Sequence, residues 1–256
     1  MTLCVWTVMV DDDLMSDKRD QIVPWGFEEF RDMAALEQEQ RRIASLTPSR
    51  WLPGPAPIVA AGVFVAFACG EEGPGRTGDR AFVGATATRG TTELARVVVE
   101  GRSGAPYRAG YLAAREGALI EDALRALLAT GVEPDVVLVD ATGRDHARGA
   151  GLALHVGAVL DLPTVGVTHR PLLASGPEPE DVVGATSELR LDGAVVGRWL
   201  RVHSGVRPLA VHAAWRTDDE TAVSVVLGVT GAARTPEPLR LARMAARETR
   251  ADREGR

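Results

Sequence analysis

One segment constrains the fold of this chain more than any other. Residues 135–140 read DVVLVD, a nearly continuous apolar run of the kind buried on both faces of a parallel sheet. A turn and a helical segment follow, and residues 164–169, TVGVTH, form a second apolar run. A strand, a helix of about a dozen residues and another strand make a βαβ unit with parallel strands. The chain is therefore predicted to be an α/β protein.

The flanking segments extend this unit into a larger sheet. Their patterns predict an amphipathic helix over 27–46, strands over 58–69, 80–90 and 92–101, and a helix over 111–130. After the βαβ unit come a hairpin over 188–202 that turns at Asp192-Gly193, a strand over 207–215, and helices over 218–230 and 236–256. Three antiparallel strands, a helix and a parallel βαβ unit indicate an RNase-H-like mixed sheet flanked by helices, although other α/β folds share this outline.

The length of 256 residues is enough for one sizeable domain. We expect residues 1–25 to be a poorly ordered extension, residues 26–248 to form the domain, and residues 249–256 to be a charged tail. No internal repeat is present in the sequence.

Composition excludes several classes of protein. The net charge of −6 argues against a general nucleic-acid coat protein, but the unevenly placed arginines leave room for a local basic groove. Two cysteines are too few for a disulfide framework, which fits a reducing cytosol. No apolar stretch approaches the roughly 20 residues that span a bilayer, and the first ten residues lack the basic start of a signal peptide. We therefore expect a cytoplasmic protein without membrane contact, and a monomer.

Four residues are candidates for chemistry. Glu116 lies on the apolar stripe of its predicted helix, where a carboxylate is costly unless it is paired or bound to a metal. The alternative is that Glu116 lies at a solvated edge. Asp140 ends a buried strand, and ligand crevices of α/β sheets lie outside the carboxyl ends of strands. An N-cap or turn-forming aspartate is the plainer interpretation. His169 ends the next strand, and we expect His146 to begin the intervening helix near the same edge.

Two carboxylates and a histidine at one strand edge favour a hard, oxygen-ligated cation such as Mg²⁺. The sequence contains no CxxC, HExxH, Walker, G-x-S-x-G or GxGxxG motif in a suitable context, which argues against zinc, nucleotide and serine-hydrolase sites. His155, His203 and His212 are interpreted as core or surface histidines.

Three segments together resemble the endonuclease V family. They are PYRAGYLAAREG, PDVVLVDATGRDHARGAGLALHVGAVLDLPTVGVTH and GRWLRVHSGVRPLAVHAAW. The resemblance covers roughly residues 27–248 and implies an RNase-H-like nuclease that nicks nucleic acid near inosine, a deaminated adenine, using Mg²⁺, with Mn²⁺ as an alternative. It implies that Glu116 and Asp140 bind the metal, and that His146 and His169 belong to the catalytic site. By the same resemblance Tyr107 is a wedge beside the lesion, and the pocket for the flipped hypoxanthine is formed by Gly110, Leu112, Gly143, Gly151 and Leu152.

The resemblance also exposes departures from the family pattern. Phe64 stands where the family has its first metal-binding aspartate, and His169 stands where it has a lysine. Asp145 replaces the residue that precedes the histidine of the central motif. Because Mg²⁺ depends on its carboxylates, loss of one should weaken metal binding and reduce turnover by orders of magnitude. Asp145, Glu71 and Glu72 are alternative carboxylates, although none lies at the matching place on the first strand.

Three functions stay open at this point. The chain is either an inosine-directed DNA or RNA endonuclease with weakened or lost activity, or a non-catalytic descendant that binds nucleic acid or a protein partner. The third possibility is an enzyme repurposed to a small nucleoside or phosphate metabolite. The position of the Phe64 side chain relative to Glu116 and Asp140 tests the comparison with the family.

Overall fold

The computed structural model describes residues 32–55, 57–70 and 73–255. The expected extension at residues 1–25, together with Phe27, Phe30, Glu71 and Glu72, lies outside these residues. The first described helix, α1, spans Met33–Ser45, and Asp32 caps it by accepting a hydrogen bond from the Ala34 amide at 3.0 Å. This agrees with the amphipathic helix predicted from the sequence, over the part that is described.

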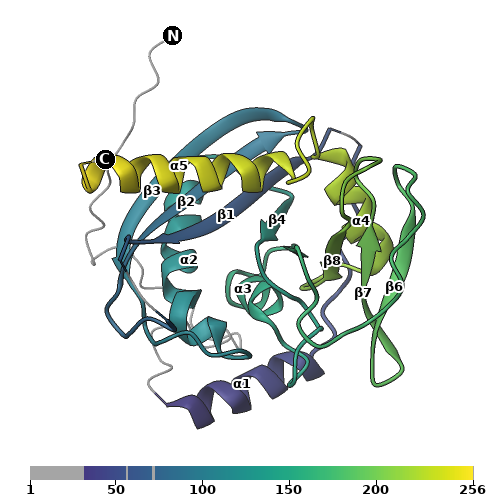
Figure 1. Cartoon of the computed structure of the whole chain (residues 1–256), viewed down its shortest axis with the longest axis horizontal. Coiled ribbons are helices and arrows are strands. Elements are labelled where there is room, and N and C mark those ends of the chain that lie inside the picture. The colour runs from purple at the N-terminus through teal and green to yellow at the C-terminus, as the bar shows by residue number, and fades with distance from the viewer. Residues whose placement is uncertain (1–31, 56, 71–72, 256) are drawn as a thin grey trace.

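An eight-stranded mixed sheet forms the centre of the molecule (Figure 1). Its strand order is β3-β2-β1-β4-β5-β8-β7-β6. The strands are β1 (Val59–Phe67), β2 (Arg80–Arg89), β3 (Thr92–Arg102), β4 (Val136–Val139), β5 (Thr164–Thr168), β6 (Thr186–Leu191), β7 (Ala194–Leu200) and β8 (Leu209–Ala213). Strands β1, β2 and β3 are antiparallel neighbours, whereas β4 pairs in parallel with both β1 and β5. The predicted RNase-H-like sheet is thus confirmed, and the last three strands extend it.

Helices cover both faces of this sheet. Helices α2 (Leu112–Leu128) and α3 (Leu152–Leu160) share one core with the odd-numbered residues of β1. Helices α4 (Asp219–Gly228) and α5 (Glu237–Arg253) cover the other face, where α5 runs across β1 and β2 (Figure 1). None of the helices in the described part of the chain is long and apolar enough to cross a membrane.

Close packing of α5 on the sheet depends on two glycines in the strands beneath it. A Cβ atom at Gly84 would lie 2.1 Å from the Ala242 carbonyl oxygen, and one at Gly62 would lie 2.4 Å from the Pro238 carbonyl carbon. Real Cβ atoms do not approach backbone this closely, so only glycine lets the helix lie against β1 and β2. The position of α5 matters for the site, because Arg243 projects from it.

The connection from β4 to β5 differs from the prediction in one respect. We expected His146 to begin the intervening helix, but α3 begins at Leu152, and residues 141–151 form a loop. Gly151 is the N-cap residue of α3, and a Cβ atom there would lie 2.3 Å from the Thr142 carbonyl oxygen. The loop folds back on itself too tightly to be helical, which the glycines at 143, 149 and 151 favour but local periodicity does not reveal.

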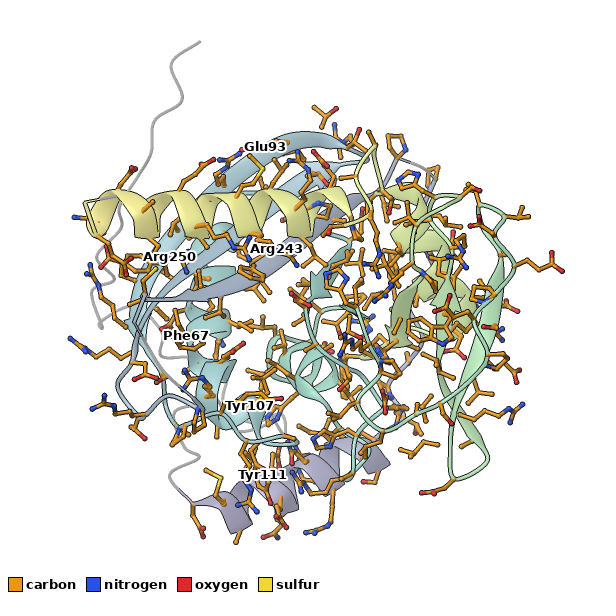
Figure 2. All side chains as sticks on the ribbon, in the orientation of Figure 1. Phe67, Glu93, Tyr107, Tyr111, Arg243 and Arg250 are labelled. Carbon is orange, nitrogen blue, oxygen red and sulfur yellow. The ribbon has the colours of Figure 1, made fainter. Side chains whose placement is uncertain are left out.

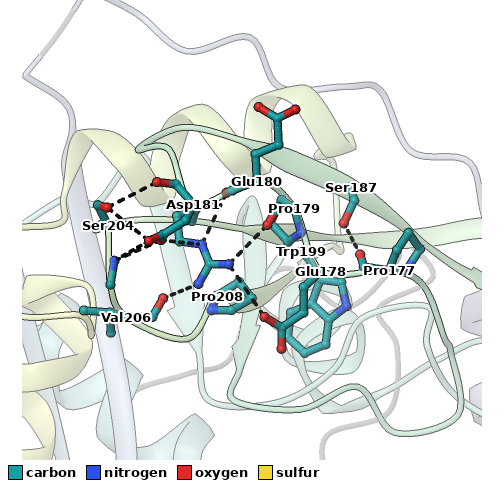
Figure 3. A network of polar contacts seen from close by, with 12 residues as sticks. Pro177, Glu178, Pro179, Glu180, Asp181, Ser187, Trp199, Ser204, Val206 and Pro208 are labelled. Carbon is teal, nitrogen blue, oxygen red and sulfur yellow. Dashed lines mark hydrogen bonds and ion pairs between the residues drawn. The ribbon is translucent and has the colours of Figure 1, made fainter.

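Two buried charged residues fix the long connection between β5 and β6. At its start, the Asp145 carboxylate accepts hydrogen bonds from the amides of Leu172, Leu173 and Ala174, at 2.6, 2.9 and 2.8 Å. At its far end, Arg201 donates to backbone carbonyls of Pro179 and Val206 and pairs with Glu178 and Asp181 (Figure 3). Asp145 is fully buried and Arg201 is nearly so. The connection is therefore held in one conformation although it contains little regular structure.

Candidate active site

Two cavities lie side by side beyond the carboxyl end of β4. We call the first the carboxylate cavity; its lining residues are Val63, Phe64, Val65, Tyr107, Leu112, Glu116, Ile120, Val139 and Asp140. The second is lined by residues of α1, of the loop before α2, of the starts of α2 and α3, of the loop after β4, and by Thr168 and residues 170–172. We call it the base cavity, because the resemblance to the family implies a base pocket formed by several of these residues. Tyr107, Leu112 and Asp140 border both cavities. A ligand with two parts could therefore occupy both at once.

The two predicted carboxylates meet in the carboxylate cavity. Asp140 follows β4, and Glu116 projects from α2 on one side of the sheet. Burial raises the pKa of Glu116 to about 7, with the Arg115 cation opposing the shift and the Asp140 carboxylate adding to it. A carboxyl group with such a pKa can take up or release a proton at neutral pH. Glu116 thus lines the same cavity as Asp140 and is not an exposed residue at a solvated edge.

Phe64 borders the same cavity as Glu116 and Asp140. Val63 of β1 pairs with Val139 of β4, which places Phe64 level with Asp140 along the parallel pair. Its ring lies toward α5, where the guanidinium groups of Arg243 and Arg247 lie 4.8 and 5.6 Å from the ring centre. Glu116 therefore reaches the cavity from one face of the sheet and Phe64 from the other.

Asp140 is paired with a cation that sequence reasoning missed. The Nη2 atom of Arg243 lies 3.2 Å from its Oδ2 atom, and Figure 2 shows the Arg243 side chain extending from α5 into the interior of the molecule. Burial raises the pKa of Asp140, while Arg243 and then His169 oppose the rise. More than one hundred residues separate Arg243 from Asp140, and an arginine in an amphipathic helix carries no local signal of such a role.

His169 and His146 occupy different surroundings. His169 is exposed after β5; burial and the Arg234 cation lower its pKa, which Asp140 opposes. His146 is buried, and its ring nitrogens lie 3.0 Å from the Gly110 carbonyl oxygen and 3.2 Å from the Arg148 amide. An Nε2–H tautomer satisfies both contacts, donating to Gly110 and accepting from Arg148. His146 therefore holds the wall of the base cavity together.

The carbonyl oxygen of Gly110 joins the walls of the base cavity. It accepts hydrogen bonds from Gln40 Nε2 at 3.4 Å and from Arg148, besides the contact with His146. Gly110 itself has a φ of 81°, which a residue with a side chain adopts only under strain. Gln40 on α1 and Arg148 in the loop were not predicted from the sequence, because their roles depend on contacts between residues far apart in the chain.

Most of the predicted pocket residues line the base cavity. Tyr107, Gly110, Leu112, Gly151 and Leu152 do so, and Tyr107 is 51% exposed at the boundary with the carboxylate cavity. Gly143 does not line it: a Cβ atom there would lie 2.3 Å from the Ala213 carbonyl oxygen, so this glycine packs against β8. Figure 2 shows Tyr107 above Tyr111, near α1.

Asp145 is not a substitute for the missing carboxylate. Both of its oxygens accept backbone hydrogen bonds from residues 172–174, and the side chain is fully buried away from solvent. Instead it holds Arg170, Pro171 and Leu172 in place as one wall of the base cavity. His155 and His212 are fully buried as well, which agrees with their interpretation as core residues.

The model of the endonuclease V family matches residues 55–244, well over half of the chain. The chain belongs to the endonuclease V family. Endonuclease V of Methanopyrus kandleri is 41% identical over 154 residues, which cover 60% of this chain and 65% of that protein. Endonuclease V of Roseiflexus castenholzii is 39% identical over 137 residues, covering 54% and 60%. The matched segment thus spans less than two thirds of the length of these curated relatives.

Solved endonuclease V structures share the fold over most of their length. The Streptomyces avermitilis structure has a TM-score of 0.75 at 30% identity and covers 86% of this chain and 92% of its own. The catalytic domain of human endonuclease V has a TM-score of 0.76 at 28% identity, with coverage of 87% and 97%. These are RNase-H-like folds, and endonuclease V proteins are generally metal-dependent.

The donor set of this chain does not fit a divalent cation. Mg²⁺ and Mn²⁺ take oxygen ligands, mostly from carboxylates. Within residues 32–55, 57–70 and 73–255, no three His, Cys, Asp or Glu side chains are grouped so that they could hold a metal ion. At the carboxylate cavity Phe64 offers no ligand atom, and Asp140 already pairs with a guanidinium.

Proposed function

We propose that this chain recognises inosine in nucleic acid and cleaves the strand slowly. Its cleavage is far slower than that of the same site with aspartate in place of Phe64. The observation that carries this proposal is the pair of adjoining cavities that share Tyr107, Leu112 and Asp140. One cavity accommodates a base and the other meets the neighbouring backbone phosphate. Membership of the endonuclease V family supports inosine as the base.

The base cavity supports recognition of a nucleotide turned out of the stack. An extruded base is read by hydrogen bonds to its edge and by contact with its faces. The polar groups that face this cavity include His146, Thr168 and Arg170, and its apolar walls include Leu112 and Leu152. Tyr107 is half exposed at the mouth, where an aromatic ring can fill the gap left in the stack.

Two features of the carboxylate cavity support slow cleavage. The loss of a carboxylate at position 64 removes one negative charge that would help to bind Mg²⁺ or Mn²⁺. The Arg243 guanidinium pairs with Asp140, so a divalent cation would have to displace it. We infer that divalent cations bind weakly here and that phosphodiester hydrolysis falls accordingly.

A related complex gives the proposal its context. A Ciona intestinalis endonuclease V structure contains a 24mer DNA with an inosine followed by a ribo-adenosine. Its sequence is 20% identical to this chain, so the likeness concerns the fold. The proposal for this chain depends on its family membership and on the two cavities.

The test is a binding and nicking assay on an oligonucleotide with one inosine, in DNA and RNA form, with the adenosine oligonucleotide as control. Wild type, Phe64→Asp and the double variant Phe64→Asp/Arg243→Ala are compared in Mg²⁺ and in Mn²⁺. We expect all three to bind the inosine strand at least tenfold more tightly than the control, and the double variant to nick at least a hundredfold faster than wild type.

Arg253→Ala is the matched control variant, since it removes an exposed ion pair with Glu100 from the same helix. It should behave as wild type. Rapid nicking by wild type would contradict the proposed slow cleavage. Equal affinity for the inosine and adenosine strands would contradict inosine recognition, and absence of any oligonucleotide binding would favour a small nucleoside or phosphate metabolite as the ligand.

A further inference from the structure

A guanidinium occupies the side of the carboxylate cavity that α5 closes. Arg243 makes two contacts there, an ion pair with Asp140 at 3.2 Å and a stacking contact with Phe64 at 4.8 Å. Its side chain is 23% exposed, and that of Asp140 is 31% exposed. Because both are largely screened from solvent, the pair is stronger than one on the open surface.

The stacking contact explains why phenylalanine at position 64 suits an arginine at position 243. An aromatic face attracts a guanidinium. Arginine is less strongly hydrated than lysine, so it loses less hydration free energy when it leaves water. Arg247, one turn farther along α5, lies over the same ring at 5.6 Å. Phe64 and Arg243 thus form a matched pair: the ring that cannot bind a metal holds a cation in place.

Arg243 also has hydrogen-bonding capacity that the protein does not use. Its Nε atom is buried and has no hydrogen-bond partner among the described residues. A buried donor without a partner is costly, and such groups are rare in folded proteins unless a ligand or water satisfies them. The planar guanidinium has several N–H groups in a fork that matches the oxygens of a phosphate.

His169 also lies near this carboxylate. His169 follows β5, close enough to Asp140, Arg234 and Arg243 for their charges to act on it. Arg234 donates to the Pro208 carbonyl oxygen at 2.6 Å, and Arg207 is its charged neighbour. Arg243 is therefore the cation that acts most strongly on Asp140. A guanidinium at this place repels a divalent cation and attracts an anion.

We propose that Arg243 takes the place of the divalent cation in this chain, so that its guanidinium, held by Asp140 and Phe64, binds a phosphate oxygen of the bound strand directly. This inference depends on the proposed function for the identity of the anion, a nucleic-acid phosphate. It predicts that strand binding does not require a metal. It also predicts that Arg243 blocks the metal site, so that restoring the site requires changes at both positions 64 and 243.

The first experiment measures Mn²⁺ binding by electron paramagnetic resonance, without any nucleic acid. The proteins are wild type, Phe64→Asp, Arg243→Ala, Phe64→Asp/Arg243→Ala and the control Arg253→Ala. We expect wild type and Arg253→Ala to bind Mn²⁺ at least tenfold more weakly than the double variant, with the single variants between them. Wild-type affinity equal to that of the double variant would overturn the inference, whatever the nucleic-acid results.

The second experiment measures oligonucleotide affinity in EDTA, with inosine-containing and inosine-free strands of equal length. Wild type and Arg253→Ala should bind, Arg243→Ala should bind both strands about tenfold more weakly, and Arg243→Lys should lie between because it keeps the charge without the fork. Unchanged affinity in Arg243→Ala, or wild-type binding that needs a divalent cation, would overturn the inference.

The two proposals fail in distinguishable ways. Loss of the preference for inosine, with the Arg243 effect intact on both strands, overturns only the proposed function. Thermal unfolding of each variant identifies any that fails to fold, in which case Arg243→Lys, which preserves volume and charge, supplies the comparison in both experiments.

Discussion

The Nη2 atom of Arg243 on α5 lies 3.2 Å from the Oδ2 atom of Asp140 at the end of β4. This contact connects α5 to Asp140, which the sequence indicated as the strongest candidate for a catalytic or metal-binding residue. It depends on the packing of α5 on β1 and β2, on the Phe64 ring beneath the guanidinium, and on the surrounding loops.

Arg243→Ala should lower the free energy of unfolding by about 1 to 2 kcal/mol, since it removes a partly buried ion pair and a cation–π contact together. Urea unfolding at pH 7 measures the change. Arg253→Ala removes an exposed pair and should cost less than about 0.5 kcal/mol. Equal effects of the two substitutions would show that the Arg243 contact adds nothing beyond a surface pair.

Gly84→Ala should destabilise the protein by roughly 2 kcal/mol or more, because its Cβ atom would lie 2.1 Å from the Ala242 carbonyl oxygen. To relieve the clash, α5 must shift and carry Arg243 away from Asp140. Gly228→Ala is the control, since a Cβ atom there meets nothing within 4 Å. Unfolding curves measure the stability, and oligonucleotide affinity in EDTA should fall with Gly84→Ala but not with Gly228→Ala. Wild-type stability in Gly84→Ala would mean that α5 lies farther from the sheet.

Asp145→Ala should release the segment at residues 172–174, because three backbone amides lose their acceptor. We expect a loss of roughly 2 to 3 kcal/mol in unfolding free energy, with water replacing part of the lost bonding at the exposed Leu172 and Leu173. Hydrogen exchange of these three amides should accelerate before global unfolding. Asp135→Ala, which removes an exposed acceptor for the single amide of Val59, is the control. Unchanged protection at residues 172–174 would argue against the role of Asp145.

The contribution of His212 to stability should fall as the pH is lowered. Burial lowers the pKa of this fully buried histidine from 6.5 to about 4, and the Asp145 carboxylate opposes the shift. Between these values the unfolded chain binds a proton that the folded chain does not, so stability is full above pH 6.5 and is lost as the pH falls toward 4. The contribution is roughly 2 kcal/mol between pH 7 and pH 5.

Urea unfolding at both pH values, for wild type and His212→Gln, measures this contribution. Burial also lowers the pKa of His155, to about 3. Its effect on the unfolding free energy is the same in wild type and in His212→Gln, so it cancels in the difference between the two proteins. A difference that does not change between pH 7 and pH 5 would contradict the assignment to His212.

Local sequence patterns determined the outline of this protein. The apolar runs of β4 and β5, the alternation in β2 and β3, and the Asp192-Gly193 turn each specify an element through contacts close in the chain. From these, the mixed sheet with parallel β4 and β5 could be predicted, whereas the parallel pairing of β1 with β4 was seen only in the structure. The motifs around Glu116 and Asp140 indicated the family, and the departure at Phe64 was visible without coordinates. The start of α3 was misplaced because the tight loop before it depends on the contact of Gly151 with Thr142.

Only the tertiary structure determined which side chain pairs with Asp140. Arg243 is one arginine among several on α5, and nothing in its sequence neighbourhood distinguishes it from Arg240 or Arg247. Its role arises because Gly84 admits the helix close to the sheet, and because Phe64 and Asp140 lie level on neighbouring strands. Charge compensation of this kind acts through space at a few ångströms, between residues far apart in the chain. Sequence patterns specify the elements, and the packing of those elements specifies which charges meet.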